Sequence, residues 1–468
     1  MTAHRLTVIW DERFRKYDFG AGHPFQMSSR ALAARLLEAT LAPEPGVEWI
    51  REIDPASKAE LATFHTQEYL GLVERSSSGT RPVFLDTGDT PAFPGCWEAS
   101  GRVASATVRA VALTRERDAP VFQPSGGLHH AHPDRASGFC IFNDVALAVR
   151  RGLDGGDRVA YLDIDAHHGD GVMYGFFDSG RVLDIDFHQD GRTLFPGTGF
   201  PNETGQGDGE GFKVNLPLPP GAGDEALVPL FRRVVPPLVR EFRPDLIVLQ
   251  HGMDGHMGDR LAGLQYTPEG YATVLDELVD LSRELCRSRL LVTGGGGYTP
   301  ENVARGLARA GHRLAGSTSG PGRDDPLPIA WRAEFQRETG EAAPLDWSIP
   351  SQRLASPWNA AAEEQLVGDL ESALGRRFPR PVFRAERSSR RDRGDRRPKP
   401  GCLVRYRTRR ATVRSLPDRS LGRGPSRPPS LRSSAVLGRC GRGHPPRKAP
   451  RSSPRGRTRT GHRAPASR

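Results

Sequence analysis

Short apolar runs alternate along this chain with longer stretches that have the period of an α-helix. The apolar runs fall at residues 6–10, 119–123, 158–165, 181–188, 244–252 and 289–297. Each run is too short for a typical helix, so each predicts a buried strand. Helical patterns lie between them, at 28–41, 97–115, 144–153, 223–242 and 268–286. This alternation predicts an α/β fold, a single domain with a mostly parallel open β-sheet and helices on both faces.

One of these helical patterns contains adjacent prolines. Pro236 and Pro237 lie inside the pattern at 223–242. Because proline has no N–H group to donate and its ring crowds the preceding turn, this helix is expected to kink or break there.

Charge divides the chain into two unequal parts. Residues 384–468 contain 25 Arg and 2 Lys against 4 acidic residues, whereas the whole chain of 468 residues has a net charge of +10. Residues 1–383 therefore carry a net negative charge of about −13. The basic segment is rich in Pro, Ser and Gly and has no apolar period, so it is expected to be a disordered tail. We expect one domain over 1–383, with a helical extension at about 316–380.

The basic tail has two interpretations. Arginine-rich segments bind nucleic acid through phosphate contacts, and nucleic acid is expected as a partner only through this segment. The excess of Arg over Lys, without any repeat, also fits an out-of-frame extension of a G/C-rich gene. No oligomeric state follows from the sequence.

Location is indicated by the N-terminus and the cysteines. The opening MTAHRLTVIWDERF contains charged residues before any apolar core of signal-peptide length, and no stretch has the length of a transmembrane helix. The five cysteines show no metal-binding spacing and no disulfide framework. These features predict a cytoplasmic protein without membrane contact.

Polar groups follow four of the predicted strands. They occur in SGGLHHAHPDRASGFCIFND (125–144), in the segment after 158–165, in HGMDGHMGD (251–259) and in GGGGYTP (294–300). In parallel α/β sheets, ligands bind outside the carboxyl ends of the strands. The four segments are therefore expected to meet at one functional site.

The segment YLDIDAHHGDGV (161–172) has the composition of a metal site. If the chain stays extended, Asp163, Asp165 and His167 point to the same face. Carboxylates held together near a core repel one another unless a cation lies between them, and Asp and His are both zinc ligands. The alternative is a turn rich in Asp, Gly and His that caps the next helix.

The order of these motifs resembles the histone deacetylase family. The chain reads GGLHHA, SGFC, ND, DIDAHHGDGV, FPGTG, GMD, GD and GGGGY in the family's order and at similar spacing. The resemblance runs from about residue 5 to about 315, and more loosely to about 380. The opening WDERFRKYDFGAGHPF is most like the bacterial acetoin-utilization-type deacetylases. The resemblance implies the arginase/deacetylase fold.

The resemblance also implies roles for individual residues. The implied metal ligands are Asp165, His167 and Asp254. The implied catalytic residues are His129 and His130, the carboxylates Asp163 and Asp170 that hold them, and Tyr298. Substrate would be bound by Gly138, Phe139, Phe195, Leu261 and the rim carboxylate Asp89, with Arg30 in a channel behind the metal. His132, His188, His251 and His256 match no catalytic position and are interpreted as structural or solvent-exposed.

Three positions depart from the family pattern. Asp259-Arg260-Leu261 replaces Asp-Pro-Leu in the pocket wall, and the proline before Arg30 is missing. Asp186 replaces a Ser that often helps to bind a structural potassium ion near Asp163, where an Asp can also bind a monovalent cation.

The resemblance predicts a zinc-dependent hydrolase, with Fe²⁺ as the alternative metal. Its substrate would be an acetyl or other short acyl group on the ε-amine of lysine in a protein. The alternative substrate is an acetylated polyamine. An alternative of another class is a scaffold that binds acyl-lysine without turnover.

Overall fold

A computed structural model of the chain describes residues 5–41, 44–79, 83–317, 320–349, 355–375 and 377–378. In these residues, one sheet has the strand order β2-β1-β3-β8-β7-β4-β5-β6, and every neighbouring pair is parallel. The strands are β1 (Leu6–Ile9), β2 (Val47–Ile50), β3 (Val121–Gln123), β4 (Val159–Asp163), β5 (Val182–Gln189), β6 (Lys213–Leu218), β7 (Leu246–Gln250) and β8 (Leu290–Thr293).

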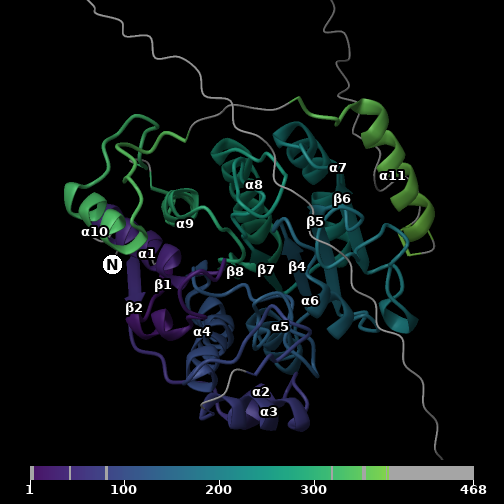
Figure 1. Ribbon diagram of the computed structural model, residues 1–468. Coiled ribbons are helices and arrows are strands. Elements are labelled where there is room, and N and C mark those ends of the chain that lie inside the picture. The colour runs from purple at the N-terminus through teal and green to yellow at the C-terminus, as the bar shows by residue number, and fades with distance from the viewer. Residues whose placement is uncertain are drawn as a thin grey trace, which may run out of the picture. The chain divides into compact units, whose positions relative to one another are not determined.

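Helices cover both faces of this sheet. Figure 1 shows α7, α8 and α9 on one side of the strands and α4 and α5 on the other. The helices are α1 (Met27–Leu41), α2 (Lys58–Leu61), α3 (Gln67–Ser77), α4 (Cys96–Arg117), α5 (Asp144–Asp154), α6 (Asp170–Gly175), α7 (Asp224–Phe242), α8 (Pro268–Cys286), α9 (Pro300–Leu314), α10 (Ile329–Thr339) and α11 (Ala360–Leu374). Short 3-10 turns lie at Glu12–Lys16 and Gly207–Gly209. The predicted α/β class and helix layers are confirmed.

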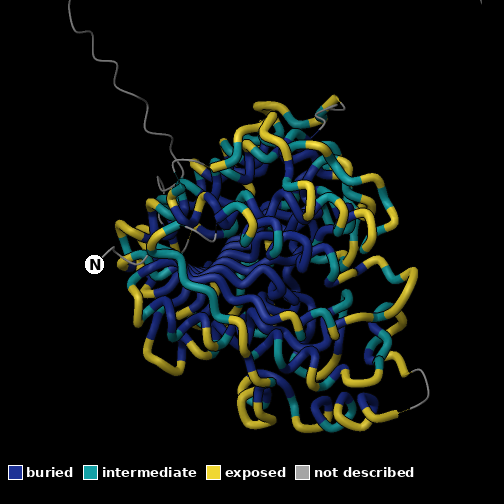
Figure 2. Tube along the Cα trace, turned by 90° about the vertical axis from the view of Figure 1, so that its left-hand side faces the viewer, coloured by how far each residue is buried: buried dark blue, intermediate teal, exposed yellow. Residues whose placement is uncertain are grey.

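The sheet is buried along most of its length, as the dark central strands of Figure 2 show. Two apolar clusters pack against it. One joins alternate strand residues, such as Leu162 and Leu249, to α7, α8 and α9, and the other joins Tyr161 and Val248 to α4 and α5. This division follows from strand geometry, because neighbouring side chains point to opposite faces. A sheet covered on both faces explains why central strands such as β7 and β8 are largely apolar.

Of the kink or break predicted at the proline pair, the break is wrong. Helix α7 continues from Asp224 to Phe242 with Pro236 and Pro237 inside it. The two prolines are half-buried, whereas Val234, Val235, Leu238 and Val239 beside them are fully buried against the sheet. Packing of this apolar face holds the helix together across the missing hydrogen bonds.

The C-terminal part of the chain is described only to residue 378. Helices α10 and α11 lie in the range expected for a helical extension. The predicted disordered tail, 384–468, lies outside the described residues. Within the described residues, no helix is long and apolar enough to cross a membrane.

Candidate metal centre and active site

Three buried side chains converge where β4 and β7 end. Asp165 and His167 follow β4, and Asp254 follows β7, which pairs with β4 in parallel. The Nδ1 atom of His167 lies 3.2 Å from Asp165 Oδ1 and 2.9 Å from Asp254 Oδ2. One potential ligand atom from each residue lies within 4.8 Å of the other two. The predicted metal ligands are therefore brought together.

These donors fit a divalent metal ion. Two carboxylates and one imidazole are a ligand set that zinc and related metals use in catalytic sites. Burial raises the pKa of Asp254 to about 7, and the nearby charge of Asp165 adds to this shift. Burial alone would lower the pKa of His167, but its bonds to the two carboxylates raise it to about 10. A cation between the carboxylates would offset their repulsion.

Protein groups also fix the orientation of Asp165. Its Oδ2 atom accepts a hydrogen bond from the Gln250 amide at 2.7 Å and another from the Gly296 N–H at 2.7 Å. Gln250 ends β7, and Gly296 belongs to the glycine run after β8. Two neighbouring strand ends therefore hold the carboxylate that a third strand end supplies. Such outer contacts orient metal ligands.

Two imidazole–carboxylate pairs lie beside this centre. His129 Nδ1 is 2.7 Å from Asp163 Oδ2, and His130 Nδ1 is 2.7 Å from Asp170 Oδ1. The Nε2 atoms of the two rings are 3.1 Å apart, and both residues are buried. Each Nδ1 therefore faces a carboxylate, which leaves Nε2 as the atom of each ring that can exchange a proton with a substrate.

The pKa values of the two histidines are shifted in opposite directions. Burial opposes the charge on His129, but the charges of Asp163 and Asp165 raise its pKa to about 10. Burial lowers the pKa of His130 to about 4, and the neighbouring charge of His129 adds to this shift. Paired titratable groups with opposed shifts are typical of acid–base sites.

Tyr298 lies next to His167, one of the predicted metal ligands. Its ring centroid is 6.2 Å from that of His167 and 5.9 Å from that of Phe139, with an edge-on arrangement in both pairs. Its backbone N–H donates to Asp259 Oδ2 at 2.8 Å. Burial raises the pKa of Tyr298 well above its usual value, so its hydroxyl keeps its proton and can donate it in a hydrogen bond.

Arg30 is buried behind the glycine run. Its guanidinium donates to the carbonyls of Gly295 and Gly297 and is only 1% exposed. Burial lowers the pKa of Arg30, and the negative charges of Asp254 and Asp165 oppose this shift. Arg30 therefore lies near two of the predicted metal ligands and is held by the loop that follows β8.

An exposed aromatic side chain lies against the histidine pair. Phe195 lies with its ring centroid 5.0 Å from that of His130 and is 43% exposed. A Cβ atom at Gly138 would lie only 2.4 Å from His130 Cδ2 and 3.0 Å from Phe195, so no side chain fits there. Leu261 is 40% exposed and its N–H donates to Asp259 at 2.9 Å.

Asp89 is half-buried and is linked to Phe139 through Thr90. Thr90 Oγ1 donates to Asp89 Oδ1 at 2.9 Å and accepts the N–H of Phe139 at 3.0 Å. Burial raises the pKa of Asp89 to about 6, and the neighbouring carboxylate of Asp86 adds to this shift. The predicted rim carboxylate is thus connected to the aromatic wall.

Sequence reasoning missed several residues that orient the site. These are Gln250 on Asp165, Tyr161 on Asp163, Asp259 on the Tyr298 backbone, and His132, whose Nε2 lies 3.0 Å from Asp170 Oδ2. A glutamine that ends an apolar strand was the available signal for Gln250. Nothing in the sequence distinguished His132 from its neighbours.

The other histidines near these motifs are all buried, so none is solvent-exposed. His188 Nδ1 lies 2.6 Å from Asp186 Oδ1, and the N–H of Gly169 donates to Asp186 Oδ2 at 2.7 Å. Both carboxylate oxygens of Asp186 therefore have protein partners at the position where the sequence left a structural potassium site open.

A buried carboxylate–imidazole donor set beside two imidazole–carboxylate pairs is typical of metal-dependent hydrolases. Residues 23–314 match the model of the histone deacetylase domain. The chain is 33% identical over 351 residues to the acetoin utilization protein AcuC of Bacillus subtilis, covering 73% of this chain and 89% of that protein. It is 34% identical over 303 residues to a probable deacetylase of Archaeoglobus fulgidus, covering 63% and 82%.

Comparison of the fold also shows similarity to a deacetylase domain. The crystal structure of the HDA15 HD domain superposes with a TM-score of 0.64 at 25% identity, covering 80% of this chain and 97% of that one. The chain belongs to the histone deacetylase family. The resemblance inferred from the motifs is confirmed.

Proposed function

We propose that this protein is a zinc-dependent hydrolase that removes acetyl or other short acyl groups from the ε-amine of lysine in proteins. One observation carries the proposal. Asp165, His167 and Asp254 lie together beside two imidazole–carboxylate pairs, His129–Asp163 and His130–Asp170. Similarity to AcuC supports a protein of the acetoin-utilization type.

The donor set would hold zinc, with Fe²⁺ as the alternative. A bound zinc ion supplies Lewis-acid chemistry, since it polarises an amide carbonyl and lowers the pKa of water. The imidazoles do the proton transfers. A neutral ring Nε2 of the histidine pair accepts a proton from the attacking water, and a protonated Nε2 donates one to the leaving amine. Asp163 and Asp170 keep the two rings oriented through Nδ1.

Tyr298 has the role of a hydrogen-bond donor to the developing oxyanion. Its proton is retained because burial disfavours the phenolate. A preorganised donor of this kind stabilises charge that appears only in the transition state. Asp259 holds the tyrosine backbone by accepting its N–H.

The approach to the site suits an extended acyl-lysine side chain. In this proposal Gly138, Phe139 and Phe195 would form a narrow apolar passage with Leu261 in its wall, and Asp89 at the rim would accept backbone N–H groups of the substrate. The same acidic rim also fits the cationic chain of an acetylated polyamine. Acetylpolyamine amide hydrolysis is therefore the second candidate.

Three further proposals accompany this function. A cytoplasmic location is proposed because Cys96, Cys140 and Cys286 are buried free thiols. A structural potassium ion near Asp186 would have to share its carboxylate oxygens with His188 and Gly169. Nucleic-acid contact is proposed only for residues 384–468.

The test assays the purified chain on acetyl-lysine peptides and acetylated polyamines side by side. Turnover of the peptides supports the proposed function, and turnover of polyamines alone favours the second candidate. If the folded, metal-loaded protein turns over neither but binds acetyl-lysine peptide, the chain is a binding scaffold and the hydrolase proposal fails.

A further inference from the structure

A third imidazole shares a carboxylate with the histidine pair. His130 Nδ1 lies 2.7 Å from Asp170 Oδ1, and His132 Nε2 lies 3.0 Å from the other oxygen, Oδ2. Among the described residues, no further side chain bonds to this carboxylate. The two rings, which come from residues i and i+2 of one segment, therefore hold the carboxylate between them, one at each oxygen.

Both hydrogen bonds run from an imidazole to the carboxylate. Burial opposes the charge on Asp170, but the hydrogen bonds from His130 and His132 lower its pKa well below the usual value. An ionised carboxylate can only accept, so His130 Nδ1 and His132 Nε2 each carry a proton. Removing His132 would leave a buried carboxylate oxygen without a donor, which is unfavourable.

The backbone on both sides of these bonds is fixed by other contacts. Asn143 Nδ2 donates to the carbonyls of His129 and Ala131 at 2.9 Å each. A Cβ atom at Gly171, the residue after Asp170, would lie only 2.5 Å from each of the same two carbonyl oxygens. The start of α6 therefore packs directly on the segment that carries the rings, and the remaining freedom is in the side chains.

His132 could also serve only as packing. It is 8% exposed, and its ring lies parallel to that of Tyr174 with the centroids 6.4 Å apart. If packing is its only role, replacing it lowers the stability of the fold and leaves the chemical step unchanged. If it orients the carboxylate, replacing it lowers the rate of reaction in protein that remains folded.

We propose that His132 is a positioning residue for the hydrolysis, and that it acts on His130 through Asp170. With one oxygen bound to each ring, the carboxylate is kept from rotating away from His130. The Nε2 atom of His130 then stays where it can exchange a proton with a substrate. This inference rests on the proposed function, and it assigns no proton transfer to His132 itself.

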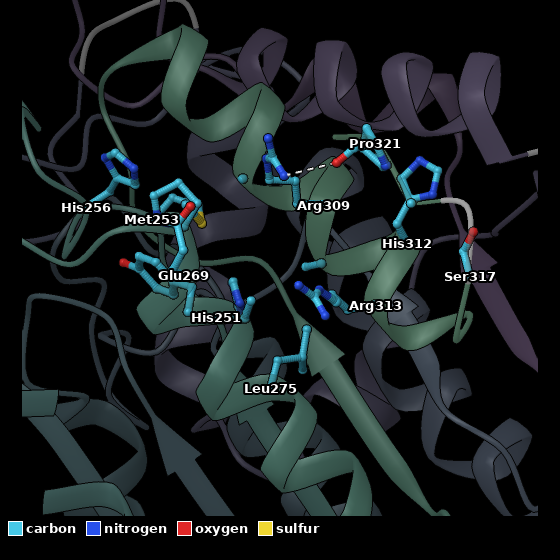
Figure 3. Close-up of a pocket in the computed structure, with 16 residues that line it drawn as sticks. His251, Met253, His256, Glu269, Leu275, Arg309, His312, Arg313, Ser317 and Pro321 are labelled. Carbon is cyan, nitrogen blue, oxygen red and sulfur yellow. Dashed lines mark hydrogen bonds between the residues drawn. The ribbon is translucent and has the colours of Figure 1, made fainter. Parts of the chain in front are cut away.

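The test compares three variants of the full, zinc-loaded chain. His132→Leu removes the donor, whereas His132→Gln keeps one, because the glutamine amide has about the reach of the imidazole Nε2. His312→Leu is the matched control, since it makes the same change at another buried histidine. Figure 3 shows His312 in the wall of a cavity that none of His130, His132 and Asp170 lines.

We measure kcat and KM for an acetyl-lysine peptide, together with metal content and thermal unfolding. Loss of a contact that orients a site residue typically costs about 10- to 100-fold in activity. His132→Leu should therefore lower kcat by roughly tenfold or more with little change in KM. His132→Gln and His312→Leu should keep kcat close to the native value. A native kcat in His132→Leu, or equal losses in the Leu and Gln variants at position 132, would overturn the proposal.

A second measurement requires no turnover. Exchange of the His130 Nδ1 proton with solvent can be followed by NMR in the chain with ¹⁵N-labelled histidine. Because a hydrogen bond to a charged group is worth about 1.5 to 3 kcal/mol, His132→Leu should speed this exchange by roughly tenfold or more, and His132→Gln should not. If the native chain does not turn over the peptide, the proposed hydrolysis fails. The exchange rate then decides on His132 alone, and an unchanged rate in His132→Leu would overturn its positioning role.

Discussion

Adding one methyl group at Gly138 should impair catalysis much more than it lowers the stability of the fold. An alanine Cβ there would lie 2.4 Å from His130 Cδ2, whereas ordinary contact begins at 3.4 Å. The His130 ring must therefore move by about 1 Å. Such a movement disrupts its 2.7 Å bond to Asp170 or its 3.1 Å contact with His129.

The magnitude follows from this displacement. Misplacing a catalytic group by about 1 Å can reduce the rate by about 100-fold. This corresponds to about 2.7 kcal/mol in the activation free energy. We therefore expect Gly138→Ala to lower kcat/KM for an acetyl-lysine peptide by at least about 100-fold.

Gly156→Ala is the matched control. Gly138 has φ +54 and Gly156 has φ +92, so alanine is strained at both positions, but no atom lies within 4 Å of a Cβ at Gly156. Backbone strain of about 1 to 2 kcal/mol should lower the stability of both variants. Activity is compared with metal content and thermal unfolding in each. If the activity of Gly138→Ala stays within threefold of that of Gly156→Ala, the proposed catalytic role of the His130 ring beside Gly138 is wrong.

Three further perturbations test other parts of the site. Tyr298→Phe should lower kcat by about 100- to 1,000-fold with little change in KM, as steady-state kinetics would show; an unchanged kcat would remove the oxyanion role. Because the pKa of Asp89 is raised to about 6, its carboxylate ionises as the pH rises through 6. The KM for peptide should fall over that range, and Asp89→Asn should abolish the change. Deleting 384–468 should leave peptide turnover unchanged and remove binding to DNA in a mobility-shift assay.

The fold was predictable where apolar runs are long and continuous. β4, β7 and β8 are buried on both faces, which gives largely apolar sequences, and β5, although it contains Asp184 and Asp186, begins with an apolar pair. β2 and β6 were missed because they lie at the two edges of the sheet. β6 contains Lys213, Asn215 and Pro217, which an edge strand tolerates. These residues interrupt the apolar run by which a strand is recognised in the sequence.

The candidate site was predictable as far as its residues lie in recognisable motifs. Asp165 and His167 are close in sequence, and the strand-end rule places Asp254 beside them. The supporting contacts were not predictable, because they depend on three-dimensional neighbours. His132 reaches Asp170 across 38 positions, and Asp259 reaches the N–H of Tyr298 across 39. The continuous helix through Pro236 and Pro237 likewise depends on packing against the sheet.

The central claim is that Asp165, His167 and Asp254 hold a metal ion that the hydrolysis requires. The most direct measurement is peptide deacetylation by the full chain together with its metal content, before chelation, after chelation and after zinc is added back. We predict one zinc ion per chain, loss of turnover with loss of the metal, and recovery of both on addition of zinc. Asp254→Asn should fail to recover either. Full turnover by metal-free native protein would contradict the account.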